Sequence, residues 1–187
     1  ITAEPITIAM QTPFRISRGS RTECHVVRVY IEHNGKQAQG ECTPYPRYGE
    51  SSESVLAQIH QASSSLETAF ERGMTEPAEL RDYLQSLLTG GAARNAVECA
   101  LWDFEAQQNE QMFPNSVFEL PAQIVTAMTV SIGTPEAMAT QAREYVANGA
   151  KLLKVKLDGE QVVERVSAVR GAVPGVKIVL DANEAWT

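Results

Sequence analysis

The sequence contains few of the residues that build disulfide frameworks and zinc sites. It has three cysteines and three histidines in 187 residues, and neither set forms closely spaced pairs. Scattered, odd-numbered cysteines favour reduced thiols, so we expect a cytoplasmic protein. No run of eighteen apolar residues is present, and residues 1–10 lack the basic and apolar regions of a secretory signal. We therefore expect neither a membrane span nor secretion.

Positive charge is also scarce. Sixteen lysines and arginines stand against 23 acidic residues, which gives a net charge of −7. Nucleic-acid binding usually requires a basic face, so we expect no nucleic-acid partner. A small anionic substrate is still compatible with this charge, because a local basic pocket can lie within an acidic protein. The hydrophobic fraction of 43% is enough for a packed core.

The first part of the chain predicts strands. In residues 6–10, large apolar side chains alternate with a polar or a small one, and residues 24–32 are rich in valine and tyrosine. Asn34-Gly35 is typical of a tight hairpin turn, and residues 36–42 form the returning strand. Residues 12–23, with two serines, three arginines and a glycine, predict a mobile polar loop.

Three helices are predicted next, from Ser51, over residues 76–88 and over residues 92–109. The third has a face of small side chains, including Ala93, Ala96 and Ala100, which allows another backbone to approach closely.

A different pattern follows Pro114. The predicted strands at residues 125–132, 151–157 and 176–181 alternate with helices at residues 134–149 and 160–173. Such alternation favours a parallel sheet. The change of pattern predicts two domains, residues 1–120 and residues 121–187.

Two lysines stand out in the second of these strands. Lys154 and Lys156 are two residues apart, so they share one face of a strand whose neighbours are apolar. Two ammonium groups in a partly desolvated space disfavour each other's charge, which suits a lysine acting as a base. The alternative is an edge strand with solvated lysines.

An aspartate ends the third strand. Asp181 follows an apolar run, where a carboxylate is well placed to bind a metal ion; the alternative is a cap for a following helix. In parallel βα folds the active site lies beyond the carboxyl ends of the strands, and both motifs occur there. A base beside a metal ligand suits removal of a proton next to a carboxylate.

Several segments together resemble the muconate-lactonising subgroup of the enolase superfamily. Within it the resemblance is strongest to the bacterial dipeptide epimerases that act on L-Ala-D/L-Glu, through residues 12–21, 41–50 and 149–158. The segments that carry the wider resemblance are residues 40–44 (GECTP), 92–96 (AARNA), 100–103 (ALWD), 154–156 (KVK) and 181–183 (DAN).

The resemblance implies an α/β fold, in which an α+β capping domain is followed by the first three strands of a TIM-type (β/α) barrel. It implies an isomerase that removes and returns the α-proton of a dipeptide such as L-Ala-D/L-Glu through an enediolate, in murein peptide metabolism. Enolase-superfamily sites combine a lysine base with Mg²⁺. We further expect a homo-oligomer.

The resemblance also assigns residues. Lys156 is the base, Lys154 assists it and contacts the substrate carboxylate, and Asp181 is one ligand of Mg²⁺. Thr129 is expected to contact the substrate, and Asn183 is expected to orient the metal or the substrate. Arg21 is expected to bind the glutamate-side carboxylate, with a solvated loop arginine as the alternative.

Other functions on the same scaffold stay open: cycloisomerase, o-succinylbenzoate synthase and N-acylamino-acid racemase. Complete family members continue for five more barrel strands, which carry the remaining metal ligands and the opposing base. We therefore expect the carboxyl-terminal part of the barrel to be missing and this chain to be inactive alone, so a non-catalytic binding module is a further alternative.

Overall fold

The computed structural model of the chain describes residues 1–16, 19–110 and 122–186. Within these ranges, none of the helices combines the length and apolarity that crossing a lipid bilayer requires.

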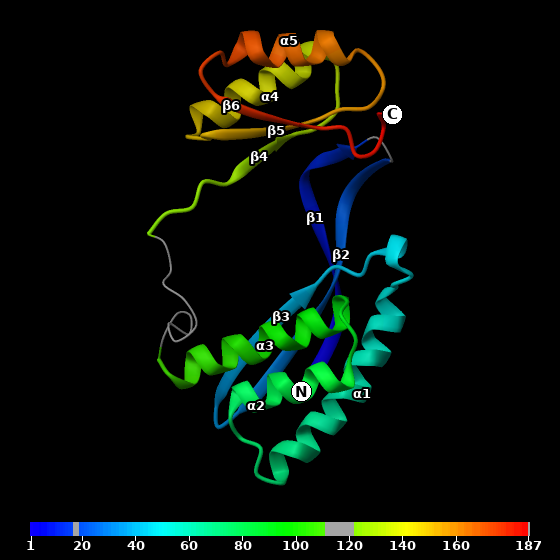
Figure 1. The fold of residues 1–187 in the computed structure, drawn as a ribbon, viewed down its shortest axis with the longest axis vertical. Coiled ribbons are helices and arrows are strands. Elements are labelled where there is room, and N and C mark those ends of the chain that lie inside the picture. Colours follow the sequence, from blue (N-terminus) through cyan, green and yellow to red (C-terminus); the bar gives the residue numbers. More distant parts are fainter. Residues whose placement is uncertain (17–18, 111–121, 187) are drawn as a thin grey trace. The chain divides into compact units, whose positions relative to one another are not determined.

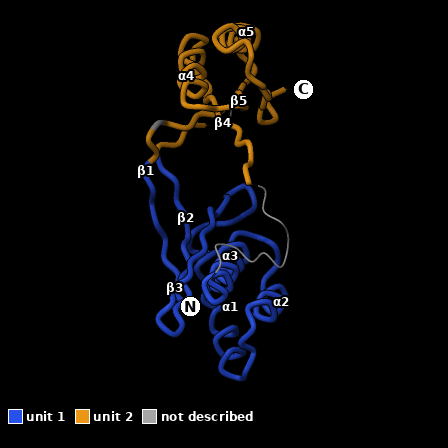
Figure 2. The backbone as a smooth tube through the Cα atoms, turned by 90° about the vertical axis from the view of Figure 1, so that its left-hand side faces the viewer, with its two compact units in different colours: residues 1–9, 23–120 blue, residues 10–22, 121–187 orange. Residues whose placement is uncertain are grey.

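The chain folds into two compact units (Figure 2). One contains residues 1–9 and 23–120, and the other contains residues 10–22 and 121–187. The predicted boundary after residue 120 falls in the segment 111–121, which lies outside the described residues.

The first unit is built on a three-stranded sheet in the order β1-β2-β3, where β1 is Thr2–Ile16, β2 is Gly19–His33 and β3 is Lys36–Cys42. The turn between β2 and β3 has positive φ angles at Asn34 and Gly35, as the Asn-Gly pair predicts. β2 pairs with β3 antiparallel, and its inward residues Val27 and Val29 are completely buried.

Helices α1 (Ser52–Glu71), α2 (Pro77–Leu87) and α3 (Ala92–Gln108) pack on one side of this sheet (Figure 1). The predicted start of α1 is confirmed, because Ser51 and Ser54 form a reciprocal capping box in which each side chain accepts from the other's backbone N–H. The predicted small-residue face of α3 is also confirmed. A Cβ at Gly40 in β3 would collide with the backbone of α3 at Ala96 and Ala100, so only glycine permits this approach.

The second unit contains a parallel sheet in the order β4-β5-β6. Its strands are β4 (Ala127–Val130), β5 (Leu152–Lys156) and β6 (Lys177–Asp181), and helices α4 (Pro135–Ala147) and α5 (Val162–Ala172) cover one face (Figure 1). Thr134 caps α4 by accepting from the N–H of Ala137. The strand–helix alternation predicted from the sequence is confirmed, and the strands are shorter than predicted.

The prediction of a loop over residues 12–23 is wrong. β1 extends to Ile16 and β2 begins at Gly19, so the hairpin continues beyond its apolar part. A ladder of backbone hydrogen bonds does not depend on side-chain polarity, and these residues are mainly exposed, so the sequence carries no buried-face pattern that would have shown the strands. The tip of the hairpin belongs to the second unit, where the N–H of Ile132 donates to the carbonyl of Arg15.

Candidate active site

The residues selected from the strand ends lie on one face of the parallel sheet. Thr129 of β4 is in register with Lys154 of β5, and Lys156 of β5 is in register with Asp181 of β6. Because side chains alternate along a strand, these four residues share the face opposite to helices α4 and α5.

The two faces of β5 differ in burial. Leu153 and Val155 are completely buried in the core formed with α4 and α5. On the other face the Lys156 side chain is only 8% exposed, whereas that of Lys154 is 40% exposed. The Lys156 side chain is therefore almost completely desolvated, whereas that of Lys154 is partly desolvated.

Asp181 links the two lysines. Its Oδ2 atom accepts from Lys154 Nζ at 2.7 Å and from Lys156 Nζ at 2.8 Å. Hydrogen bonds from Lys154 and Lys156 hold the pKa of Asp181 well below its usual range, with a further contribution from the N–H of Asn183. The carboxylate thus stays ionised and offsets the repulsion between the two ammonium groups.

Asn183 completes the cluster. Lys156 Nζ donates to its side-chain oxygen at 2.6 Å, and its N–H donates to Asp181 Oδ1 at 2.9 Å. The backbone of Asn183 is left-handed, with φ of 49°, a conformation that asparagine tolerates better than most residues. This turn brings its amide oxygen back over Lys156.

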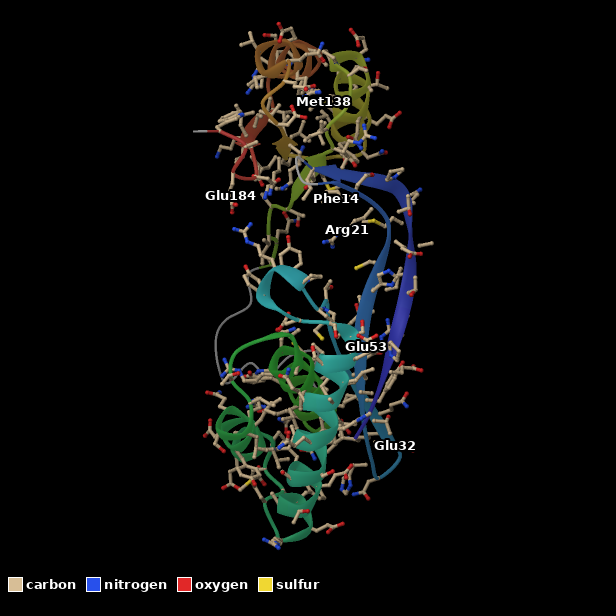
Figure 3. The ribbon with its side chains drawn as sticks, turned by 90° about the vertical axis from the view of Figure 1, so that its right-hand side faces the viewer. Phe14, Arg21, Glu32, Glu53, Met138 and Glu184 are labelled. Carbon is tan, nitrogen blue, oxygen red and sulfur yellow. The ribbon has the colours of Figure 1, made fainter. Side chains whose placement is uncertain are left out.

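Arg21 reaches the same compact unit from a different element. It is an exposed residue of β2, near the end of the hairpin, and not a loop residue (Figure 3). Side-chain hydrogen bonds and ion pairs connect Lys154, Lys156, Asp181 and Asn183. Thr129 lies beside them because it is in register with Lys154.

Sequence reasoning missed a second polar group at the strand ends. Arg165 of α5 is buried and pairs with Asp158, just after β5, at 2.5 Å. Burial acts to raise the pKa of Asp158, but the N–H of Glu160 and the guanidinium of Arg165 outweigh it and bring the pKa below its usual range. Two features of the sequence could have indicated this pair: an aspartate directly after a predicted strand, and an arginine on the apolar face of the helix that follows.

The cluster places a buried amine, that of Lys156, where an ionised carboxylate and an amide oxygen accept hydrogen bonds from it, and a lysine amine is a group that can carry a proton to or from a substrate. Its capacity for metal is partial. In residues 1–16, 19–110 and 122–186, no three histidine, cysteine, aspartate or glutamate side chains are grouped so as to hold a metal ion. Within the cluster of Lys154, Lys156, Asp181 and Asn183, the ionised carboxylate is that of Asp181.

Two protein-family models match the chain, one over most of the first unit and one over most of the second. The model of the mandelate racemase / muconate lactonizing enzyme N-terminal domain matches residues 1–115, and the enolase C-terminal domain-like model matches residues 137–187. The chain belongs to the mandelate racemase / muconate lactonizing enzyme family. The predicted family and fold class are thereby confirmed, with a capping domain and part of a barrel present.

Individual members of this family resemble the chain closely. It is 49% identical over 178 residues to the L-Ala-D/L-Glu epimerase of Escherichia coli K12, covering 95% of this chain and 53% of that protein. A solved enolase family member from Agrobacterium tumefaciens, with homology to dipeptide epimerases and with bound sodium and L-Ala-L-Glu, is 40% identical. It matches with a TM-score of 0.84 over 100% of this chain and 54% of its own.

A dipeptide epimerase from Enterococcus faecalis V583, solved with Mg and L-Leu-L-Tyr, has 25% identity and a TM-score of 0.86, covering 100% of this chain and 53% of its own. The chain spans about half the length of these relatives.

Proposed function

We propose that the intact protein is a Mg²⁺-dependent dipeptide epimerase that removes and returns the α-proton of a substrate such as L-Ala-D/L-Glu. The observation that carries this proposal is the cluster in which Lys154 and Lys156 of β5 meet Asp181 of β6 through one carboxylate oxygen. The relatives named above act on or bind dipeptides, which supports the substrate class.

Lys156 is the proposed base. Its amine is buried, and its position is fixed by strand register and by hydrogen bonds to Asp181 and Asn183. A base held in this way meets the substrate α-carbon from one side only, so epimerisation requires a second group on the opposite side. Lys154 is more exposed, and we assign to it the substrate carboxylate, because an ammonium group there balances the charge that develops when the α-proton leaves.

Asp181 is the proposed metal ligand of this chain. Its ionised carboxylate fits Mg²⁺, an ion that takes about six oxygens in octahedral geometry, but it supplies only part of that shell. Bound Mg²⁺ would add positive charge beside the substrate carboxylate. Oδ2 already accepts from both lysines, so a cation at Asp181 competes with two ammonium groups for this atom.

The remaining residues are assigned to substrate binding. Thr129 lies in register with Lys154, at the carboxyl end of β4. Asn183 contacts Lys156 and orients either the substrate or the metal. Arg21 is assigned to the side-chain carboxylate of the glutamate residue, since an exposed guanidinium can form a bidentate pair with a carboxylate.

We also propose the wider setting of the protein. Residues 1–120 form the capping domain and residues 121–187 part of a TIM-type barrel, in a cytoplasmic homo-oligomer. The free thiols of Cys24, Cys42 and Cys99 support a reducing compartment.

The function can be tested by following the substrate in deuterium oxide. The intact protein, Mg²⁺ and L-Ala-L-Glu are mixed, and the glutamate α-proton is observed by NMR. We expect this signal to disappear while L-Ala-D-Glu accumulates, with the alanine α-proton as an internal control that does not exchange. If no L-Ala-D-Glu formed and both α-proton signals remained, the proposal would be overturned.

A further inference from the structure

Arg165 occupies an unusual place in the second unit, because its charged side chain is buried beneath the loops that follow the strands. The residue is only 7% exposed. It donates from Nε to the carbonyl of Gly133 at 2.9 Å, and from one terminal nitrogen to the Asp158 carboxylate at 2.5 Å and the Glu160 carbonyl at 2.7 Å. Burying a guanidinium is costly unless it is paired and hydrogen-bonded, and these three acceptors meet that need.

The acceptors belong to different loops. Gly133 lies between β4 and α4, whereas Asp158 and Glu160 lie between β5 and α5. The loop after β6 joins the same group, because the indole N–H of Trp186 donates to the carbonyl of Asp158 at 2.9 Å. The Arg165 side chain therefore connects the loops after β4 and β5 directly, and the loop after β6 contacts the same Asp158 through Trp186.

The connection continues into the hairpin. Ile132, the neighbour of Gly133, donates its N–H to the carbonyl of Arg15 at 3.3 Å. Arg15 and Arg21 both belong to the hairpin end, residues 10–22, which is part of the second unit. The position of the hairpin end is thus tied to the loop that Arg165 holds.

The proton-transfer cluster is held by other means. Lys154, Lys156 and Asp181 are fixed by the hydrogen bonds and register of β5 and β6 and by their own ion pairs. Loosening the loops after β4 and β5 should leave these three residues in place.

We infer that Arg165 is a positioning residue for substrate binding: it fixes the loops after β4 and β5, and through the first of these the hairpin end, and so it controls KM more than kcat. This inference rests on the proposed dipeptide epimerase function.

Two matched lysine substitutions on α5 test it. Arg165→Lys keeps a positive charge for Asp158 but lacks the planar fork of donors that reaches Gly133 and Glu160 as well. Arg170→Lys is the control, since Arg170 also donates to three carbonyls (Val173, Pro174 and Val176), at the opposite end of the sheet where β6 begins. Both substitutions remove hydrogen bonds made by a side chain of α5, but only Arg165→Lys affects the loops at the carboxyl ends of the strands.

With L-Ala-L-Glu and the intact protein, we expect Arg165→Lys to raise KM roughly tenfold and to change kcat much less, because misplacement of binding groups is costly. Arg170→Lys should leave KM unchanged. Loss of folded protein alone would lower apparent kcat in both variants without moving KM. An unchanged KM in Arg165→Lys, or an equal rise in both variants, would overturn the inference.

A second readout does not depend on turnover. In Arg165→Lys the backbone N–H of Ile132 should exchange with solvent faster, and the indole N–H signal of Trp186 should shift, while that of Trp102 in α3 serves as a reference. If the Ile132 exchange rate and the Trp186 chemical shift in Arg165→Lys equalled those of wild type, the positioning role would be refuted, whatever the substrate of the protein. Failure of the wild type to turn over the dipeptide, with these signals altered in the variant, would refute the proposed function instead.

Discussion

At the scale of single residues, the charge balance of the site depends on Asp181. The sequence suggested two lysines that repel each other and a separate aspartate that binds metal. The structure places the carboxylate between the two ammonium groups, with its pKa held well below the usual range by Lys154 first and Lys156 second. The oxygen that we propose as a cation ligand therefore also accepts hydrogen bonds from both lysines.

This arrangement predicts a pH-dependent loss of stability in Asp181→Asn. A carboxylate with a depressed folded pKa stabilises the fold above its unfolded pKa, and that stability is lost as the pH falls through the folded value. At pH 7 we expect the free energy of unfolding to fall by about 1.5–3 kcal/mol, the range for hydrogen bonds to charged groups. Below pH ~3.9, the usual pKa of an aspartate, the free energies of unfolding of wild type and Asp181→Asn should approach each other as Asp181 becomes protonated.

Urea unfolding at several pH values measures this effect. Asp82→Asn, on the exposed side of α2, is a matched control that should change stability by less than about 0.5 kcal/mol. A difference between wild type and Asp181→Asn that did not vary between pH 7 and strong acid would show that the ion pairs do not stabilise the fold.

At the scale of elements, the sequence predicted those whose signals are local or periodic. Ser51 with Ser54, and Thr134 before Pro135, marked helix starts because a cap uses neighbouring residues. It failed for the outer hairpin, where polar residues continue a strand without burying a face, and for Arg165, whose partners come from two loops. Contacts distant in sequence leave no pattern in a single chain.

The packing of α3 on β3 gives a prediction at this scale. Gly40→Ala should lower the free energy of unfolding by about 3 kcal/mol, since the new Cβ collides with backbone atoms of Ala96 and Ala100, which cannot rotate away. Gly90→Ala, where the nearest atom is the flexible end of Arg94 at 3.4 Å, is the control from the same unit. The fluorescence of Trp102, which lies in α3, measures the urea unfolding of both variants. Equal midpoints for the two variants would disprove the close approach.

At the scale of the whole molecule, the chain is two compact units, and the residues assigned to the proposed reaction all lie in the second. Its family and fold class followed from the joint resemblance of short segments spread over the chain, and the family models confirm them. Substrate choice does not follow in the same way, because it depends on groups such as Arg21 whose role is set by geometry around a bound ligand. The parallel strands β5 and β6 bring Lys154, Lys156 and Asp181 into contact. The central claim about function is that this cluster removes the α-proton, with Lys156 as the base.

The most direct test of that claim compares two lysine variants of the intact protein. Lys156→Ala removes the proposed base, and Lys151→Ala removes an exposed lysine just before β5 as a control. Exchange of the glutamate α-proton with deuterium oxide is followed by NMR, starting separately from L-Ala-L-Glu and from L-Ala-D-Glu. We predict that Lys156→Ala loses exchange from one epimer, while Lys151→Ala exchanges both at the wild-type rate. Undiminished exchange from both epimers in Lys156→Ala would contradict the assignment of the site.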